Sequence, residues 1–172
     1  MEEIASRAGL SRATLYLHFS GKSHVYQVLL QKINAGFAER IESLVTAEHS
    51  APRKLRLFTE LTAQTYEDNP VLVAAVTGDK NFSIQKVSAP ILSEQRTQIL
   101  DCLQRILRQG IEESTIRNLD VEETAFLMYE LGNRLIVGKL AGELEYPLGR
   151  ILDVMDDLLA NGIRQKTGGN HD

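Results

Sequence analysis

The sequence predicts an all-α fold, and two observations support this prediction. Apolar residues recur at spacings of three and four along most of the chain, which is the pattern of amphipathic helices. No stretch shows the sustained two-residue alternation of a half-buried strand. We therefore expect a bundle of helices whose boundaries are marked by residues that favour helix ends.

The chain is expected to begin with a short helix and a sharp turn. The helix spans residues 2–8, with Ile4, Ala5 and Ala8 facing inward, and the small Ala5 lets a second helix approach closely. Gly9 supplies the backbone freedom that the turn needs.

A second short helix is expected from residue 12 to about residue 19. Leu10 plugs the turn before it, Ser11 caps it, and Leu15 and Phe19, four residues apart, anchor its inner face. The outer face then holds Arg12, Ala13, Thr14, Tyr16, Leu17 and His18. A short helix of this kind can enter a major groove with its N-terminus first.

A long helix is expected over residues 22–47. One face of it holds Val25, Leu29, Ile33, Phe37, Ile41 and Leu44. Such a length is unusual in a small globular protein, so we expect this helix to connect two parts of the molecule. We divide the chain into an N-terminal helix-turn-helix domain with its connecting helix, residues 1–47, and a body, residues 48–172.

The body is expected to contain five further helices, divided by residues typical of helix ends. Their expected starts are Ser50 with Pro52, Val71 after Asn69-Pro70, Ser88 with Pro90, Asp120 with Glu123, and Pro147. Gly110 is expected near the end of the third of them.

Composition and charge narrow the class of protein. Among 172 residues, 43% are hydrophobic and 24% charged, which is ordinary for a soluble globular protein. No apolar run is long enough to cross a membrane, the start lacks a basic signal region, and a single cysteine excludes a disulfide framework, so we expect a cytoplasmic protein. The net charge is −4, yet the first 34 residues hold four basic and two acidic residues. This excess of basic residues is a weak sign of phosphate binding, and a chance unevenness of surface charge explains it equally well.

The segment of residues 2–22 resembles the DNA-binding signature of the tetracycline-repressor (TetR) family. The matching residues are Ile4-Ala5, Ala8-Gly9-Leu10-Ser11, Thr14-Leu15-Tyr16, His18-Phe19 and Lys22, and the Tyr-x-His-Phe-x-x-Lys run is the specific part. The remainder is similar to the family only in the order of its helices. The resemblance implies a TetR-like helical bundle, and a DNA-binding transcriptional regulator, usually a repressor, that a small hydrophobic inducer releases from a palindromic operator.

The resemblance also implies roles for single residues. Thr14 and Tyr16 correspond to recognition-helix residues that contact base edges or the DNA backbone, and Lys22 to a lysine that binds a phosphate where the next helix begins. For Tyr16 a second interpretation is half-buried packing.

Three more positions of the motif are expected to contact double-stranded DNA. Arg12 and Ala13 lie where base specificity is usually varied, and Arg12 has the length to reach a guanine. His18 is expected to contact the DNA backbone. Ordinary surface roles remain open for Arg12 and His18.

The chain departs from the family in one respect. Family members have a further helix before this motif, whereas this sequence begins at Met1 on the first helix of the motif. We expect Ile4, Ala8, Leu15, Phe19 and Val25 to lose part of their cover, and the chain as given to bind DNA poorly. The alternative function is a helical dimerising or ligand-binding module without competent DNA binding, and the genomic DNA upstream of the Met1 codon discriminates between the two.

A ligand pocket is expected between the helices of the body, where TetR-type regulators bind their inducers. Polar or aromatic residues set among apolar ones are Tyr66, Asn81, Phe82, Tyr129, Asn133 and Arg134. We select Tyr66, Tyr129 and Asn133, with a cavity between them and the apolar stripe around Cys102. Asn133 is the best single candidate because it interrupts an apolar helix, and an amide satisfied by a neighbouring helix is the alternative interpretation.

A homodimer is expected through the last two helices. One apolar stripe holds Leu127, Leu131, Leu135 and Gly138, and the other holds Leu148, Ile151, Leu152, Met155 and Leu159. A two-fold contact of four helices buries both stripes, and the small Gly138 allows close approach.

Enzymatic, metal and cofactor sites are not expected. The four histidines are not spaced as a helical metal pair, and no Cys-x-x-Cys, phosphate-binding glycine-rich loop or Gly-x-Ser-x-Gly is present. Cys102 lies in an apolar helical stripe, which favours a packed core thiol over a nucleophile.

Overall fold

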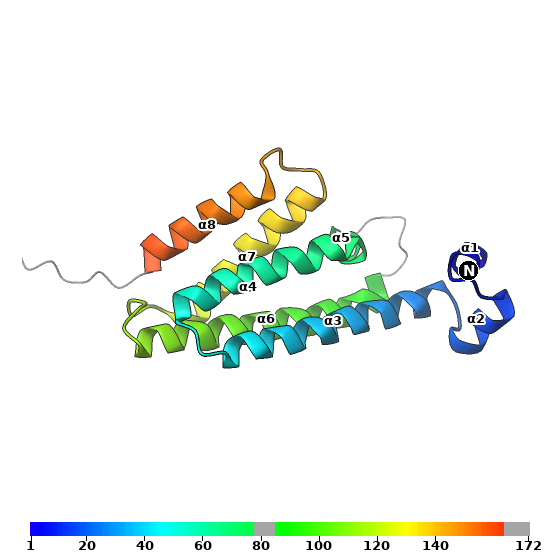
Figure 1. The fold of residues 1–172 in the computed structure, drawn as a ribbon, viewed down its shortest axis with the longest axis horizontal. Coiled ribbons are helices and arrows are strands. Elements are labelled where there is room, and N and C mark those ends of the chain that lie inside the picture. The colour runs from blue at the N-terminus through cyan, green and yellow to red at the C-terminus, as the bar shows by residue number, and fades with distance from the viewer. Residues whose placement is uncertain (78–84, 164–172) are drawn as a thin grey trace, which may run out of the picture.

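The computed structural model describes residues 1–77 and 85–163, which contain eight α-helices and no strand (Figure 1). The helices are α1 (Glu2–Arg7), α2 (Arg12–His18), α3 (Lys22–Thr46), α4 (Ala51–Asp68), α5 (Pro70–Thr77), α6 (Gln85–Glu112), α7 (Val121–Leu140) and α8 (Leu148–Ile163). The predicted all-α class is confirmed, and the long connecting helix lies where the apolar pattern predicts it.

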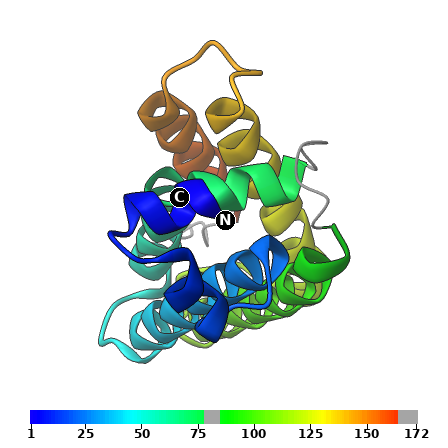
Figure 2. The ribbon, with the colours of Figure 1, turned by 90° about the vertical axis from the view of Figure 1, so that its right-hand side faces the viewer.

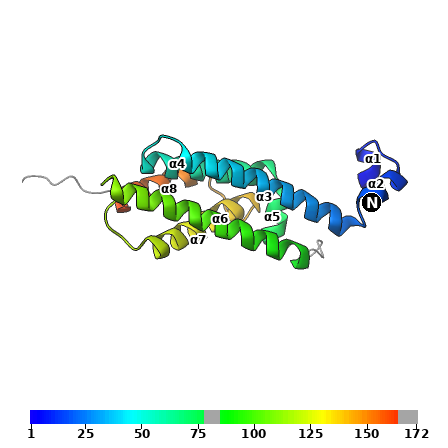
Figure 3. The ribbon, with the colours of Figure 1, turned by 90° about the horizontal axis from the view of Figure 1, so that it is seen from below.

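The long helices run side by side along the molecule. Helices α3 and α6 point in the same direction and make the most extensive contact of the fold, and α4 packs against both (Figures 1 and 3). Helices α7 and α8 form a hairpin on the other side of α4. Helices α1 and α2 lie at the end of the molecule where α3 begins, outside the bundle (Figures 1 and 2).

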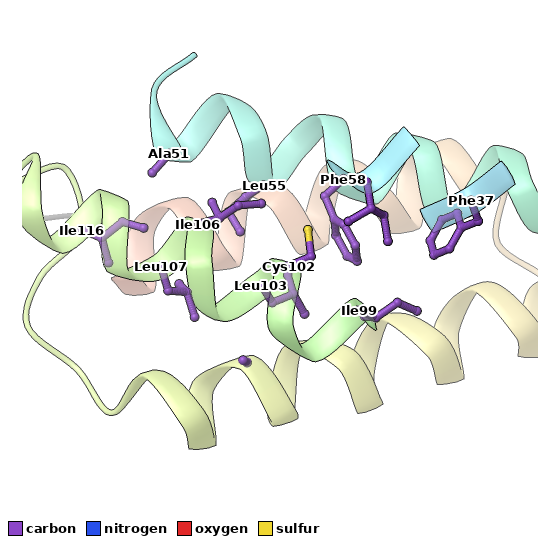
Figure 4. Packing of buried hydrophobic residues seen from close by; sticks show 12 residues of the cluster. Phe37, Ala51, Leu55, Phe58, Ile99, Cys102, Leu103, Ile106, Leu107 and Ile116 are labelled. Carbon is purple, nitrogen blue, oxygen red and sulfur yellow. The ribbon is translucent and has the colours of Figure 1, made fainter. Parts of the chain in front are cut away.

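The main core cluster is built around one stripe of α6. Cys102, Leu103, Ile106 and Leu107 are fully buried there. They belong to one cluster with Phe37 of α3 and the α4 residues Leu55 and Phe58, and Figure 4 shows Cys102 directed toward α4 and Leu107 directed away from it. A second cluster lies nearer to α5 and contains Tyr26, Leu30, Ala63, Tyr66, Leu72, Ile91, Ile136 and Val137.

Two of the expected helix starts differ in how their free backbone N–H groups are satisfied. The Asp120 side chain accepts a hydrogen bond of 2.9 Å from the Glu123 N–H, as predicted for α7. Ser50 occupies the position before α4 but its side chain makes no capping bond. Instead, Glu113 at the end of α6 accepts from the Ala51 N–H at 3.3 Å, a contact between helices that no local pattern reveals.

The expected start of α6 at Ser88 is wrong, because the helix begins at Gln85 and contains Pro90. A proline inside a helix lacks one backbone hydrogen bond and its ring crowds the carbonyl four residues earlier, which is why proline is expected in the first turn, yet this helix continues through Pro90. Gly110 lies near the end of α6, as expected, and is buried there. A Cβ there would lie 2.4 Å from Cδ1 of Ile116, so the following loop could not pack as closely.

Lys54 is a buried lysine, only 4% exposed, that ties α3, α4 and α6 together. Its ammonium donates to the Val45 carbonyl at the end of α3 and, at 2.8 Å, to Oε1 of Gln109 on α6. Gln109 also donates to the His49 carbonyl at 3.1 Å. A buried charge is tolerated here because hydrogen bonds from different elements converge on it.

We predict that Lys54→Ala lowers the free energy of unfolding by about 1–3 kcal/mol, because it leaves buried acceptors without their donor. Urea unfolding followed by circular dichroism measures the change. Arg53→Ala is the control, since the Arg53 side chain is exposed next to it and should change stability by no more than about 0.5 kcal/mol. Equal midpoints for the two variants would contradict the role given to Lys54.

Cys102 provides a second prediction. Burial raises the pKa of its thiol to about 12, so almost no thiolate forms near neutral pH. We expect no reaction with a disulfide reagent at pH 8 in the native protein and complete reaction after urea unfolding. A Ser43→Cys variant, which places a thiol on the exposed side of α3, should react at once with one equivalent. Rapid native labelling of Cys102 would show that this core opens readily.

Candidate functional site

The turn between α1 and α2 is held by local hydrogen bonds. Gly9 has φ +65°, the left-handed region that glycine adopts without strain. The Leu10 N–H donates to the Ala5 carbonyl at 2.9 Å, and the Ser11 hydroxyl accepts from the Thr14 N–H at 3.0 Å. The predicted turn and the predicted cap of α2 are therefore confirmed.

The inner face of this unit is only partly as expected. Ala5 and Leu15 are buried against each other's helices, so the expected loss of cover at Leu15 is wrong. Ile4, Phe19 and Val25 are half-buried. Ala8 is exposed because it follows the last residue of α1 and no longer points along the inner face. Leu10, expected to plug the turn, is also exposed.

The outer face gathers the residues predicted to contact DNA. Arg12, Ala13, Tyr16 and His18 are exposed on α2, Lys22 is exposed as the first residue of α3, and Thr14 is half-buried. Tyr16 is 44% exposed, which disfavours its interpretation as a packing residue, and Leu17 is 83% exposed beside it. At the start of α3, Lys22 lies where unpaired N–H groups and the helix dipole also attract an anion.

Three contacts on this face were not found from the sequence. Arg12 forms an ion pair with Glu2 of α1, and its guanidinium lies 5.6 Å from the centroid of the Tyr16 ring. The hydroxyls of Thr14 and Ser11 share a hydrogen bond of 2.7 Å. The side chains of the ion pair are 61% and 77% exposed, so the pair is weak and opens at small cost.

His24, which is not among the residues predicted to contact DNA, stabilises the turn before α3. Nδ1 of His24 accepts from the Ser20 N–H at 3.2 Å, which makes this ring nitrogen the unprotonated one. The His24 ring also meets the Phe19 ring edge to face, with centroids 5.6 Å apart. These contacts hold the short turn between α2 and α3.

The three residues selected for a ligand pocket meet in the body. Tyr66 of α4 and the α7 residues Tyr129 and Asn133 line a cavity of about 30 Å³. The Tyr66 hydroxyl donates to Oδ1 of Asn133 at 3.1 Å. Burial raises the pKa of Tyr66, with Tyr129 adding to the effect, and burial also raises the pKa of Tyr129, so both phenols stay protonated. The other lining residues are Phe58, Thr59, Thr62, Ile99, Leu103, Met128, Gly132, Ile136 and Met155.

Of the remaining pocket candidates, Arg134 does not line this cavity. The Arg134 side chain is 67% exposed and pairs with Glu143 at 2.6 Å. Asn81 and Phe82 lie outside the described residues. Cys102 belongs to the stripe that borders the cavity but does not line it, whereas Ile99 and Leu103 of that stripe do.

An exposed apolar groove of about 310 Å³ runs between α7 and α8. It contains Leu131, Leu135 and Ile151 from the predicted dimer set, and Leu127 is exposed on the same helix as the first two. The groove also includes residues outside that set, namely Tyr146, Arg150, Val154 and Leu158. Their exposure could not be deduced from spacing alone, because the pattern does not say which stripe packs inward.

The rest of the predicted dimer set lies deeper in the protomer. Leu152 packs against the second core cluster, and Met155 is buried where the groove and the cavity adjoin, lining both. Gly138 is buried as well, and a Cβ there would lie 3.1 Å from Nη1 of Arg134, a neighbour within the same chain. The side chain of Leu159 is outside the described residues.

Metal-binding and membrane-spanning features were also sought. Within residues 1–77 and 85–163, no group of three or more His, Cys, Asp or Glu side chains is placed to hold a metal ion. No helix of the described chain is both long and apolar enough to cross a membrane.

Comparison with known proteins gives three kinds of match. Residues 1–29 match the model of bacterial regulatory proteins of the tetR family. The nucleoid occlusion factor SlmA of Vibrio vulnificus is 25% identical over 151 residues, which is 87% of this chain and 71% of that protein.

Solved structures share the fold along almost the whole chain. The transcriptional regulator FadR from Bacillus subtilis, solved in complex with stearoyl-CoA, matches with a TM-score of 0.74 at 22% identity, over 95% of this chain and 88% of its own. The TetR family transcriptional regulator PfmR from Thermus thermophilus matches with a TM-score of 0.71 at 24% identity, over 93% and 86%.

Proposed function

Because this chain belongs to the tetR family of bacterial regulatory proteins, we propose that it binds a specific DNA operator and leaves it when a small hydrophobic ligand enters the body. The observation that supports this most is the single exposed face formed by α2 and the start of α3. Arg12, Tyr16 and Lys22 are exposed there, and α2 and the start of α3 lie at one end of the molecule, beyond the bundle (Figure 1). A protein that acts on chromosomal DNA in this way works in the cytoplasm.

Base recognition is assigned to the N-terminal half of α2. Arg12 and Ala13 are its first two residues and are exposed, so they enter a major groove first. Thr14 and Tyr16 follow on or beside the same face, and His18 lies at the end of the helix, nearer to the DNA backbone. We assign Lys22 to a phosphate, since it can approach the backbone from the start of α3.

We further propose a homodimer that joins the α7–α8 grooves of two copies. The groove is lined almost entirely by apolar side chains, among them Leu131, which is 46% exposed. Leu127, on the same helix, is 65% exposed. A two-fold axis through this face gives a self-complementary contact. The two helix-turn-helix units then face a palindrome with half-sites about 34–36 Å apart.

The cavity at Tyr66, Tyr129 and Asn133 is the proposed ligand site. It lies at the meeting point of α4, α6, α7 and α8, so a molecule bound there contacts most of the body. A similar fold has been solved with stearoyl-CoA, which supports ligand binding by folds of this type. We assign repression, relieved by the ligand, as the mode of regulation.

The outer face of α2 and the start of α3, which we propose contacts DNA, is called the reading face. The ion pair between Arg12 and Glu2 on this face supplies the test of DNA binding. Glu2→Gln removes a negative charge beside Arg12, so affinity for any duplex should rise about two- to fivefold at low salt. Arg12→Ala should cost about 1–3 kcal/mol on the preferred site alone. Fluorescence anisotropy measures the affinity of both variants for the intergenic DNA beside the gene. The protein is expressed from its own chromosomal locus. Glu48→Gln, an exposed glutamate just beyond the other end of α3, is the matched control.

Lys22→Ala completes this experiment, because loss of a phosphate contact should weaken all sequences alike and reduce the salt slope by about one. The regulator proposal is wrong if the protein binds the intergenic DNA no better than a scrambled duplex and selection from random duplexes returns no preferred site.

The dimer has its own test. Leu131→Arg places a charge in the α7–α8 groove, and we expect light scattering at micromolar concentration to change from a dimer to a monomer. Leu29→Arg is the matched control, because Leu29 is 43% exposed on α3 and Leu131 is 46% exposed. A wild-type monomer, or a Leu131→Arg dimer of unchanged stability, would exclude this interface.

A further inference from the structure

The cavity between α4, α6, α7 and α8 is lined without a single charged side chain. Its polar groups are the hydroxyls of Tyr66, Tyr129, Thr59 and Thr62 and the amide of Asn133, and the rest of its wall is apolar. An ion placed there would lose its hydration and gain no opposite charge in return, which is the costly way to bury a charge. The lining therefore selects against ionised ligands.

The hydrogen bonds of the lining show which polar groups remain available. The Tyr66 hydroxyl gives its proton to Asn133, and the hydroxyls of Thr59 and Thr62 donate to the carbonyls of Leu55 and Phe58 at 3.1 and 2.8 Å. These hydroxyl oxygens keep lone pairs that can accept. The amide nitrogen of Asn133 makes no hydrogen bond within the described chain, so it can donate. The cavity thus offers the Asn133 amide and the Tyr129 hydroxyl as donors beside hydroxyl acceptors.

The nearest cation does not alter this conclusion. The Arg96 guanidinium lies 5.4 Å from the centroid of the Tyr129 ring, but Arg96 is absent from the lining of the cavity. It pairs with Glu130 at 3.2 Å, and its side chain is 45% exposed. Its charge is therefore balanced by Glu130 and by solvent.

The walls can adapt to a ligand larger than the present space. A volume of about 30 Å³ accepts little more than a water molecule. Two of the lining side chains, Met128 and Met155, are unbranched and flexible, and methionine repacks at low cost. Met155 also borders the groove between α7 and α8, so enlargement can proceed toward α8.

We propose that the ligand of this cavity is an uncharged molecule with one hydroxyl or amide group, bound between Asn133 and Tyr66, and an apolar remainder packed against Met128 and Met155. This inference rests on the proposed function, because it specifies the ligand class of the proposed site. A hydroxyl or amide fits since it can accept from the Asn133 amide and donate to a hydroxyl oxygen at the same time.

Four compounds that share a benzene ring test this proposal: benzyl alcohol, toluene, benzoate and benzylammonium. Each is titrated into the purified protein, and dissociation constants are taken from the dependence of the melting temperature on ligand concentration. We expect benzyl alcohol to bind most tightly and toluene more weakly. The two ions should bind at least about tenfold more weakly than benzyl alcohol, because their charge is buried without a partner.

A double variant isolates the polar part of the site. Tyr66→Phe combined with Asn133→Leu removes both members of the hydrogen bond at nearly constant volume, so neither group is left unsatisfied. The variant should bind toluene and benzyl alcohol equally. Asn118→Leu, which changes an exposed asparagine outside the helices, should keep the wild-type preference.

The outcomes separate this inference from the proposed function. If an ion binds most tightly and also weakens DNA binding, ligand regulation stands and the uncharged class is overturned. If toluene equals benzyl alcohol in the wild type, or the double variant keeps the preference for the alcohol, the assignment to Asn133 and Tyr66 is overturned. If none of the four compounds raises the melting temperature, both the inference and the ligand site of the proposed function are overturned.

Discussion

The buried stripe of α6 is the contact on which the rest of the structure depends. At most 1% of the surface of Cys102, Leu103, Ile106 and Leu107 is exposed, and these residues form one core cluster with residues of α3 and α4 (Figure 4). A bidentate ion pair from Arg105 to Glu42, at 2.7 and 3.0 Å, fixes α3 beside α6 at the edge of this stripe. Since α3 continues out of the bundle into the helix-turn-helix, its packing on α6 sets where the reading face stands relative to the body.

The two apolar sides of the α7–α8 hairpin follow from the same arrangement. The side toward α4 and α6 closes the core. The cavity lies on this side, where the polar pair Tyr66 and Asn133 takes the place of aliphatic side chains. The opposite side keeps Leu127 and Leu131 exposed because no other described helix covers it. A single layer of side chains separates these two sides at Met155, so the space of the cavity and the shape of the groove are not independent.

What could be predicted from the sequence is what local physics determines. The cap at Ser11 and the left-handed Gly9 depend on residues within one turn, and Asn133 was identifiable because an amide in an apolar stripe needs a partner. The misses are contacts between distant residues. The partners of Lys54, on α3 and α6, and the pairing of Arg12 with Glu2 leave no periodic trace in the sequence, since they depend on how helices meet.

The same limit applies to the electrostatics of the reading face. Counting charges suggests a basic end, yet Arg7 pairs with Glu3 at 2.9 Å and Arg12 pairs with Glu2, so both acidic residues of that end lie against its arginines. Such exposed pairs open at small cost, but they reduce the field that a distant phosphate experiences. On the proposed function, attraction to DNA of any sequence is then modest, and discrimination depends more on the short-range contacts that Arg12 would make once a groove displaces Glu2.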